Sequence, residues 1–208
     1  MFVSRTPFFY LYTMKTITER IFSLSGKNSF NTLALEVFRW QAHHNAVYRD
    51  FLHHLGAQAE EIRHAGEIPH LPIEFFKTHR VITGDHSPTL VFESSGTTGL
   101  QTSRHYVADP ALYEQSFLTT FRKQYGNPEE LCIMALLPSY LERENSSLVY
   151  MMKALIKRSQ HPGSGFYLDN LNALAEQLER RSKDRHPTLL FGVSFALLDL
   201  AERYPMKL

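Results

Sequence analysis

The chain has 208 residues and a net charge of +1 when histidine is neutral, so bulk charge predicts no nucleic-acid or anionic-membrane partner. Its hydrophobic fraction of 43% and charged fraction of 21% are those of a soluble globular protein, and no stretch reaches the roughly 20 apolar residues of a membrane span. The single cysteine, Cys132, excludes an internal disulfide and fits a cytoplasmic location.

The N-terminal part is expected to be helical. Residues 1–28 form a lead, and its early apolar stretch is short and interrupted by Pro7, which argues against a signal peptide. Residues 29–55 repeat apolar side chains at helical spacing, which predicts one long helix that stops at Gly56. The polar gap at residues 43–45 marks a bend or an exposed turn within that helix.

The next segment is expected to be a loop followed by a strand. Pro69 and Pro72 favour extended backbone, because the residue before a proline is biased away from the helical region. The strand is predicted near residues 80–83.

From residue 88 onward, strands and helices alternate. Strands are predicted in the runs PTLVFE (88–93), RHYV (104–107), LCIMALLP (131–138), FYL (166–168) and TLLFGV (188–193). A helix is predicted after each of the last four of these strands. The predicted N-terminal caps of the helices are, in order, Asp109, Ser146 or Ser147, Asp169 and Ser194. This alternation predicts an α/β domain over residues 29–208, with a mostly parallel sheet flanked by helices.

The connection between the first two strands is a run of small hydroxyl residues and glycines. The run consists of Ser94, Ser95, Gly96, Thr97, Thr98 and Gly99. Glycines let backbone N–H groups approach a phosphate, and hydroxyls add further donors. A tight hairpin turn uses the same residue types but needs only about two of them. The composition therefore favours a phosphate loop, although it is neither a Walker A motif nor a G-x-G-x-x-G fingerprint.

This run resembles the ATP loop of the adenylate-forming superfamily, which includes acyl- and aryl-CoA ligases. Five blocks in order resemble, more narrowly, the LuxE-type acyl-protein synthetase family, which is near the phenylacetate-CoA ligases. The blocks are IPHLPIEFFKTHRV, FESSGTTG, SRHYV, LLPSYLERENSSLVYMM and LLFGVSFALLDLAE. The resemblance covers roughly residues 30–204 and implies that this chain is a partial N-terminal domain of such an enzyme.

The resemblance implies a two-step reaction. A carboxylic acid, in this family a fatty acid, attacks the α-phosphate of ATP to give an acyl-adenylate and pyrophosphate, and the acyl group then passes to a protein thiol. The Ser/Thr/Gly loop would bind the β- and γ-phosphates, with Mg²⁺ sharing their charge. A partner reductase would convert the acyl group to the aldehyde.

Four further residues are assigned through this resemblance. Ser103 and Arg104 stand near where many superfamily members carry Pro-Lys, and Arg104 either replaces the charge of that lysine or is a solvent-facing strand residue. Tyr140 follows a buried strand, where it lies beside the substrate carboxylate or is a half-buried surface tyrosine. Gly192 and Ser194 lie at the carboxyl end of a strand, where open α/β sheets bind ligands, although Ser194 also suits a helix cap.

Several further interpretations follow from the sequence and the resemblance. The later superfamily motifs, including a Thr-Gly-Asp that holds ribose and a lysine at the α-phosphate, are expected beyond Leu208, together with the acyl-accepting cysteine. Alternatives are a CoA ligase of the phenylacetate type and a non-catalytic nucleotide-binding fragment. The histidine pairs at 43–44 and 53–54 lie about 280° apart around a helix and predict polar surface rather than a metal site. Glu142 and Glu144 are interpreted as a charged loop.

Overall fold

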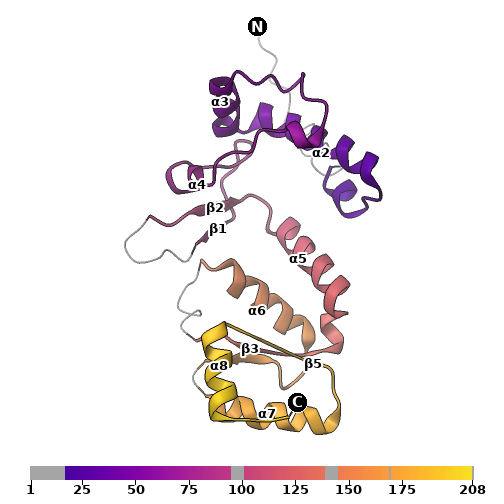
Figure 1. Cartoon of the computed structure of the whole chain (residues 1–208), viewed down its shortest axis with the longest axis vertical. Coiled ribbons are helices and arrows are strands. Elements are labelled where there is room, and N and C mark those ends of the chain that lie inside the picture. Colours follow the sequence, from indigo (N-terminus) through magenta and orange to yellow (C-terminus); the bar gives the residue numbers. More distant parts are fainter. Residues whose placement is uncertain (1–16, 95–100, 139–144, 169, 208) are drawn as a thin grey trace. The chain divides into compact units, whose positions relative to one another are not determined.

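The chain divides into two compact units, residues 1–112 and residues 113–208. The computed structural model describes residues 17–94, 101–138, 145–168 and 170–207 (Figure 1). Sequence reasoning did not anticipate a division near residue 112.

The N-terminal unit contains two successive helices where the sequence predicted one. After a helical turn at residues 17–22, α2 (Lys27–His44) and α3 (Ala46–Leu55) are separated by Asn45, whose backbone is extended. The Asn45 side chain accepts a hydrogen bond from the Tyr48 N–H at 3.1 Å and so caps α3. The predicted break is therefore confirmed, but the residue at its centre is buried rather than an exposed turn.

A small core lies under these helices. The buried residues of that core are Phe38, Ala42, Tyr48, Leu52 and Ala59. The segment that follows contains η1 (Ala65–Glu67) and the short helix α4 (Phe75–Thr78), which the sequence did not predict. Residues 80–83 are not a strand, so that prediction is wrong. Their backbone instead leads to a turn in which the Gly84 N–H donates to the His44 carbonyl at 2.8 Å.

Two antiparallel strands complete the N-terminal unit. β1 (Leu90–Glu93) pairs with β2 (Arg104–Val107), with Leu90 opposite Val107 and Glu93 opposite Arg104. Both strands were predicted from the sequence. This two-stranded sheet is separate from the parallel sheet of the second unit.

The second unit is a sequence of alternating helices and strands. In chain order its elements are α5 (Pro110–Tyr125), η2 (Pro128–Glu130), β3 (Cys132–Leu136), α6 (Ser147–Ser159), β4 (Gly165–Tyr167), α7 (Leu171–Asp184), β5 (Thr188–Gly192) and α8 (Ser194–Arg203). The three strands are parallel in the order β4-β3-β5. The prediction of a mostly parallel sheet flanked by helices is confirmed for this unit.

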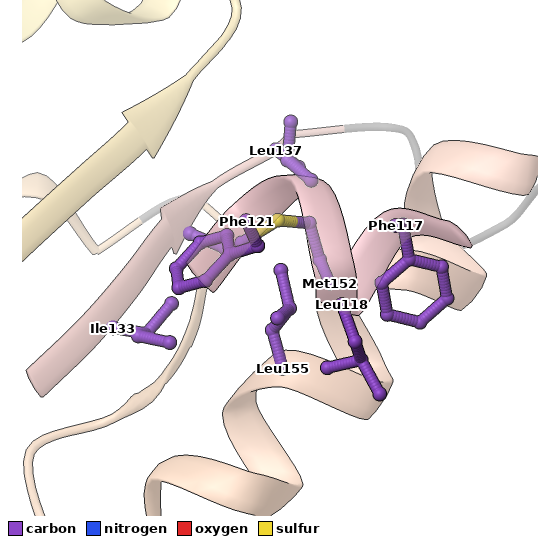
Figure 2. Packing of buried hydrophobic residues seen from close by; sticks show 8 residues of the cluster. Phe117, Leu118, Phe121, Ile133, Leu137, Met152 and Leu155 are labelled. Carbon is purple, nitrogen blue, oxygen red and sulfur yellow. The ribbon is translucent and has the colours of Figure 1, made fainter. Parts of the chain in front are cut away.

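Alternate side chains of the central strand β3 supply the two faces of this sheet, and every residue of β3 is buried. On one face Ile133, together with Leu137 just after the strand, packs with residues of α5 and α6, as Figure 2 shows. On the other face Met134 and Leu136 pack with residues of α7 and α8. In Figure 1, α6 and α7 accordingly lie on opposite sides of the strands. The unit is a three-layer α/β/α arrangement.

At the helix ends, two of the predicted caps differ from those in the structure. Ser146 caps α6, as predicted, by accepting from the Val149 N–H. The cap of α7 is Asn170, which accepts from the Ala173 N–H at 3.0 Å, while Asp169 lies outside the described residues. Ser194 is the first residue of α8 and not its cap, because Val193 holds the cap position with extended backbone. Gly126, with φ of 85°, follows the end of α5 as predicted, in a conformation that glycine adopts without strain.

Candidate functional site

The neck of the predicted phosphate loop is fixed by two hydrogen bonds. The Ser94 N–H donates to the Ser103 carbonyl at 3.0 Å, and the Ser103 N–H donates to Ser94 Oγ at 3.0 Å. The strands end at Glu93 and resume at Arg104, so the whole segment 94–103 connects them. This segment is longer than the roughly two residues that a tight hairpin turn needs, and both interpretations of its small polar residues stay predictions.

Most of the predicted loop residues lie outside the described part of the chain. These residues are Ser95, Gly96, Thr97, Thr98 and Gly99. Ser94 is exposed at the start of the connection. Its hydroxyl accepts from the Ser103 N–H and retains its own proton for donation.

Arg104 lies at the other side of the neck. Its Nε donates to Glu93 Oε1 at 3.1 Å across the strand pair, and its side chain is 57% exposed. Hydrogen bonding to Tyr106 and then to Glu93 raises the pKa of the guanidinium. The interpretation of Arg104 as a solvent-facing strand residue is confirmed, and its role in place of the superfamily lysine stays a prediction. It is a solvent-facing strand residue with a carboxylate partner, and its remaining N–H groups form a permanently charged donor set at the base of the loop.

The second unit has a topological switch point at the carboxyl ends of β3 and β5. Leu136 of β3 pairs with Gly192 of β5 at this edge. The chain leaves β3 toward α6 on one face, and it leaves β5 toward α8 on the opposite face. In open α/β sheets, ligands bind in the crevice that this divergence creates.

Gly192 and Ser194 both lie at this edge, as the sequence predicted. A Cβ at position 192 would lie 3.0 Å from the Leu136 carbonyl oxygen and 3.0 Å from the side chain of Leu197. Glycine is therefore needed for the close approach of β5, β3 and α8. Ser194 is exposed in the first turn of α8. Tyr140, the third predicted substrate contact, lies outside the described residues, as do Glu142 and Glu144.

A Thr-Gly-Asp tripeptide occurs at residues 83–85, before the loop, and the sequence reasoning did not weigh it. Thr83 Oγ1 accepts from Asn45 Nδ2 at 3.3 Å, and the Gly84 N–H bonds to the His44 carbonyl. These contacts fasten the turn to the junction of α2 and α3. The structure thus gives the tripeptide a structural role.

The thiol of Cys132 is buried at the amino edge of the parallel sheet, opposite to the switch point. Its exposed fraction is 0%. Burial raises the pKa of the Cys132 thiol, although a hydrogen bond with Ser164 and the charge of Arg181 partly oppose this. The prediction that Cys132 lies within an apolar strand is confirmed.

Near this edge, the hydroxyls of Ser159 and Ser164 form hydrogen bonds that the sequence did not indicate. Ser159 donates to the Leu131 carbonyl at 2.6 Å and lies 2.6 Å from the Ser164 hydroxyl, which accepts from the Ile133 N–H at 2.8 Å. These bonds fasten the end of α6 to the start of β3. The serines lie far apart in the sequence from the strand that they bond, so no local pattern indicated the contact.

The two adjacent histidine pairs lie on the surfaces of α2 and α3. His43, His44, His53 and His54 are exposed, as predicted for polar helix surface. Within the described ranges, no group of three His, Cys, Asp or Glu side chains is arranged to hold a metal ion. Within the same ranges, none of the helices has the length and apolar character required to cross a bilayer.

Comparison with protein-family models, with curated proteins and with solved structures finds no match to this chain.

Proposed function

We propose that the chain binds ATP through the connection between β1 and β2 and takes part in the activation of a carboxylic acid, in the first place a fatty acid, as an acyl-adenylate. The observation that carries this proposal is the hairpin neck. Ser94 and Ser103 close the base of a long connection, and Arg104 presents a cation beside it. The hydroxyls and backbone N–H groups of the small residues between them would donate hydrogen bonds to the phosphate oxygens.

In this reaction a carboxylate oxygen attacks the α-phosphorus of ATP. The bond from that phosphorus to the bridging oxygen breaks, and pyrophosphate leaves with the bonding electrons. The loop stabilises the negative charge of the departing β- and γ-phosphates and fixes their orientation. The remaining N–H groups of Arg104 add charge at the same place. Mg²⁺ would accompany the phosphates of the substrate and share their charge.

Transfer of the acyl group to a thiol would follow. Cys132 is the only cysteine of the 208 residues, and its complete burial argues against it as the acceptor. The acceptor in this proposal is therefore a thiol other than Cys132, on a protein or on CoA. A reductase that takes over the acyl group would be the partner of the protein-acylating form.

Replacement of the loop hydroxyls tests the phosphate assignment. The Thr97→Ala/Thr98→Ala double variant is titrated with Mg-ATP in a calorimeter beside the wild-type chain. A hydrogen bond to a charged group contributes about 1.5–3 kcal/mol, so each lost bond should weaken ATP binding about tenfold to a hundredfold.

The matched control is Thr120→Ala. Thr120 is exposed on α5, and its hydroxyl donates only to the Ser116 carbonyl at 3.0 Å. This variant should bind ATP as the wild type does. Equal ATP affinity of the double variant and the wild type would contradict the phosphate loop.

A further inference from the structure

A groove of about 450 Å³ opens along α2 in the N-terminal unit. This volume falls within the range of about 300–1,000 Å³ that is usual for sites of small molecules. The floor is a helical stripe with the spacing of one face, formed by Phe30, Leu33, Ala34, Val37, Phe38 and Gln41. The sequence analysis used the apolar residues of this face only as the repeat that predicts a helix.

The apolar end of the groove is open to solvent. Ile21, Leu24 and Phe30 line it and are 38%, 39% and 56% exposed. Large apolar side chains that are exposed side by side mark a binding surface more often than scattered single ones do. From Phe30 to Gln41, α2 rises about 16 Å, which is the length of an extended alkyl chain of roughly a dozen carbons.

The other end of the stripe is polar. Asn45 and Tyr48 line the groove and are only 6% and 7% exposed. Asn45 Nδ2 donates one hydrogen bond to Thr83 Oγ1, and the same amide nitrogen carries a second proton. Gln41 and His70 add further donors at this end. None of the described residues that line the groove is acidic, so a carboxylate meets no like charge there.

The groove is connected to the hairpin of the phosphate loop within the same unit. Phe76 lines the groove, and its ring stacks on that of His105 with 6.1 Å between centroids and 14° between planes. His105 follows Arg104 in β2. One aromatic contact therefore joins the wall of the groove to the strand that leaves the loop.

We propose that this groove binds the hydrocarbon chain of a straight-chain fatty acid, with the carboxylate at the polar end near Gln41, Asn45 and His70. The assignment specifies the acid of the proposed function, and its role in catalysis rests on that function. Binding itself does not, because the groove is formed without the loop residues. The length of the apolar stripe favours an aliphatic chain over a short aryl acid.

The test is calorimetric titration of the full chain, without ATP, with dodecanoate, octanoate and phenylacetate below their micelle concentrations. Dodecanoate should bind saturably at one site. Each buried methylene contributes about 0.8 kcal/mol, which is about a fourfold change in affinity, so octanoate should bind up to about 200-fold more weakly. Phenylacetate should show no saturable binding. Absence of saturable dodecanoate binding, or equal affinities for the three acids, would overturn the proposal.

Two exposed apolar residues provide a matched pair of variants. Phe30 lines the groove and is 56% exposed, whereas Leu198 lies on α8 and is 62% exposed. Phe30→Ser should weaken dodecanoate binding about fivefold or more, since it removes apolar contact area with the alkyl chain. Leu198→Ser should leave binding unchanged. Equal effects of the two substitutions would show nonspecific adsorption and overturn the site.

The loop variant separates this inference from the proposed function. Thr97→Ala/Thr98→Ala should bind dodecanoate as the wild type does. Dodecanoate binding by a wild-type chain that does not bind ATP would refute the proposed function and leave the groove assigned. ATP binding by a wild-type chain that does not bind dodecanoate would refute the groove alone.

Discussion

At the scale of single residues, the thiol of Cys132 provides a direct check on the second unit. The side chain is fully buried in β3, and burial raises the pKa of the thiol. Both effects suppress the reactive thiolate. We expect the native chain to react with Ellman's reagent at pH 8 at least about a hundredfold more slowly than the chain unfolded in urea. Rapid stoichiometric labelling of the native chain would place Cys132 at an accessible position and reopen its candidacy as acyl acceptor.

Residue-scale prediction from the sequence was limited by contacts that only the fold creates. That Cys132 is buried followed from the apolar run around it. The partner of Arg104 did not, because Glu93 becomes its neighbour only when β1 and β2 pair in this register. The cap at Ser194 was wrong because a one-residue shift in the start of α8 gives that role to the backbone of Val193.

At the scale of elements, the turn between α6 and β4 depends on a neutral histidine. The Gly163 N–H donates to His161 Nδ1 at 3.0 Å, so this nitrogen accepts and carries no proton. Arg181 Nη1 lies 3.1 Å from Nε2, and the ring of His186 lies 4.5 Å away between centroids. Burial lowers the pKa of His161, the positive potential of His186 and Arg181 lowers it further, and Asp184 opposes the change.

This arrangement predicts a pH dependence of stability. Because folding lowers the pKa of His161, its contribution is complete above the unfolded value of about 6.5 and is lost as the pH falls from there through the folded value. The urea midpoint of the wild type should therefore decrease from pH 8 to pH 5 by more than that of His161→Gln. The variant serves to subtract the titration of the other histidines. Parallel pH profiles for the two proteins would contradict this account of the turn.

Element-scale prediction succeeded where local pattern and burial agree. The five strands from residue 88 onward and the four long helices among them follow from apolar runs and helical periodicity. The predictions for two segments differ from the structure, each for a physical reason. The segment after Pro72 forms α4 because Phe75 and Phe76 gain partners in Phe51 and His105, which no local signal reveals. Residues 81–83 are β-branched, as is typical of a strand, but they form no strand pairing.

At the scale of the whole molecule, the chain forms two units with different architectures. A helical unit carries the hairpin of the candidate loop and the apolar groove, and an α/β/α unit carries the switch point. The sequence indicated the second architecture through its alternation of strands and helices. It did not indicate the division near residue 112, because α5 begins as a continuation of the hairpin and has no linker before it.

The central claim is that the connection between β1 and β2 binds the β- and γ-phosphates of ATP. The most direct test is competition binding to the full chain, with Mg-ATP displaced by pyrophosphate or by AMP. A loop that binds the terminal phosphates predicts that pyrophosphate displaces ATP at concentrations near its own dissociation constant, while AMP at about a hundredfold excess does not. Displacement by AMP without displacement by pyrophosphate would place the nucleotide elsewhere and contradict the account.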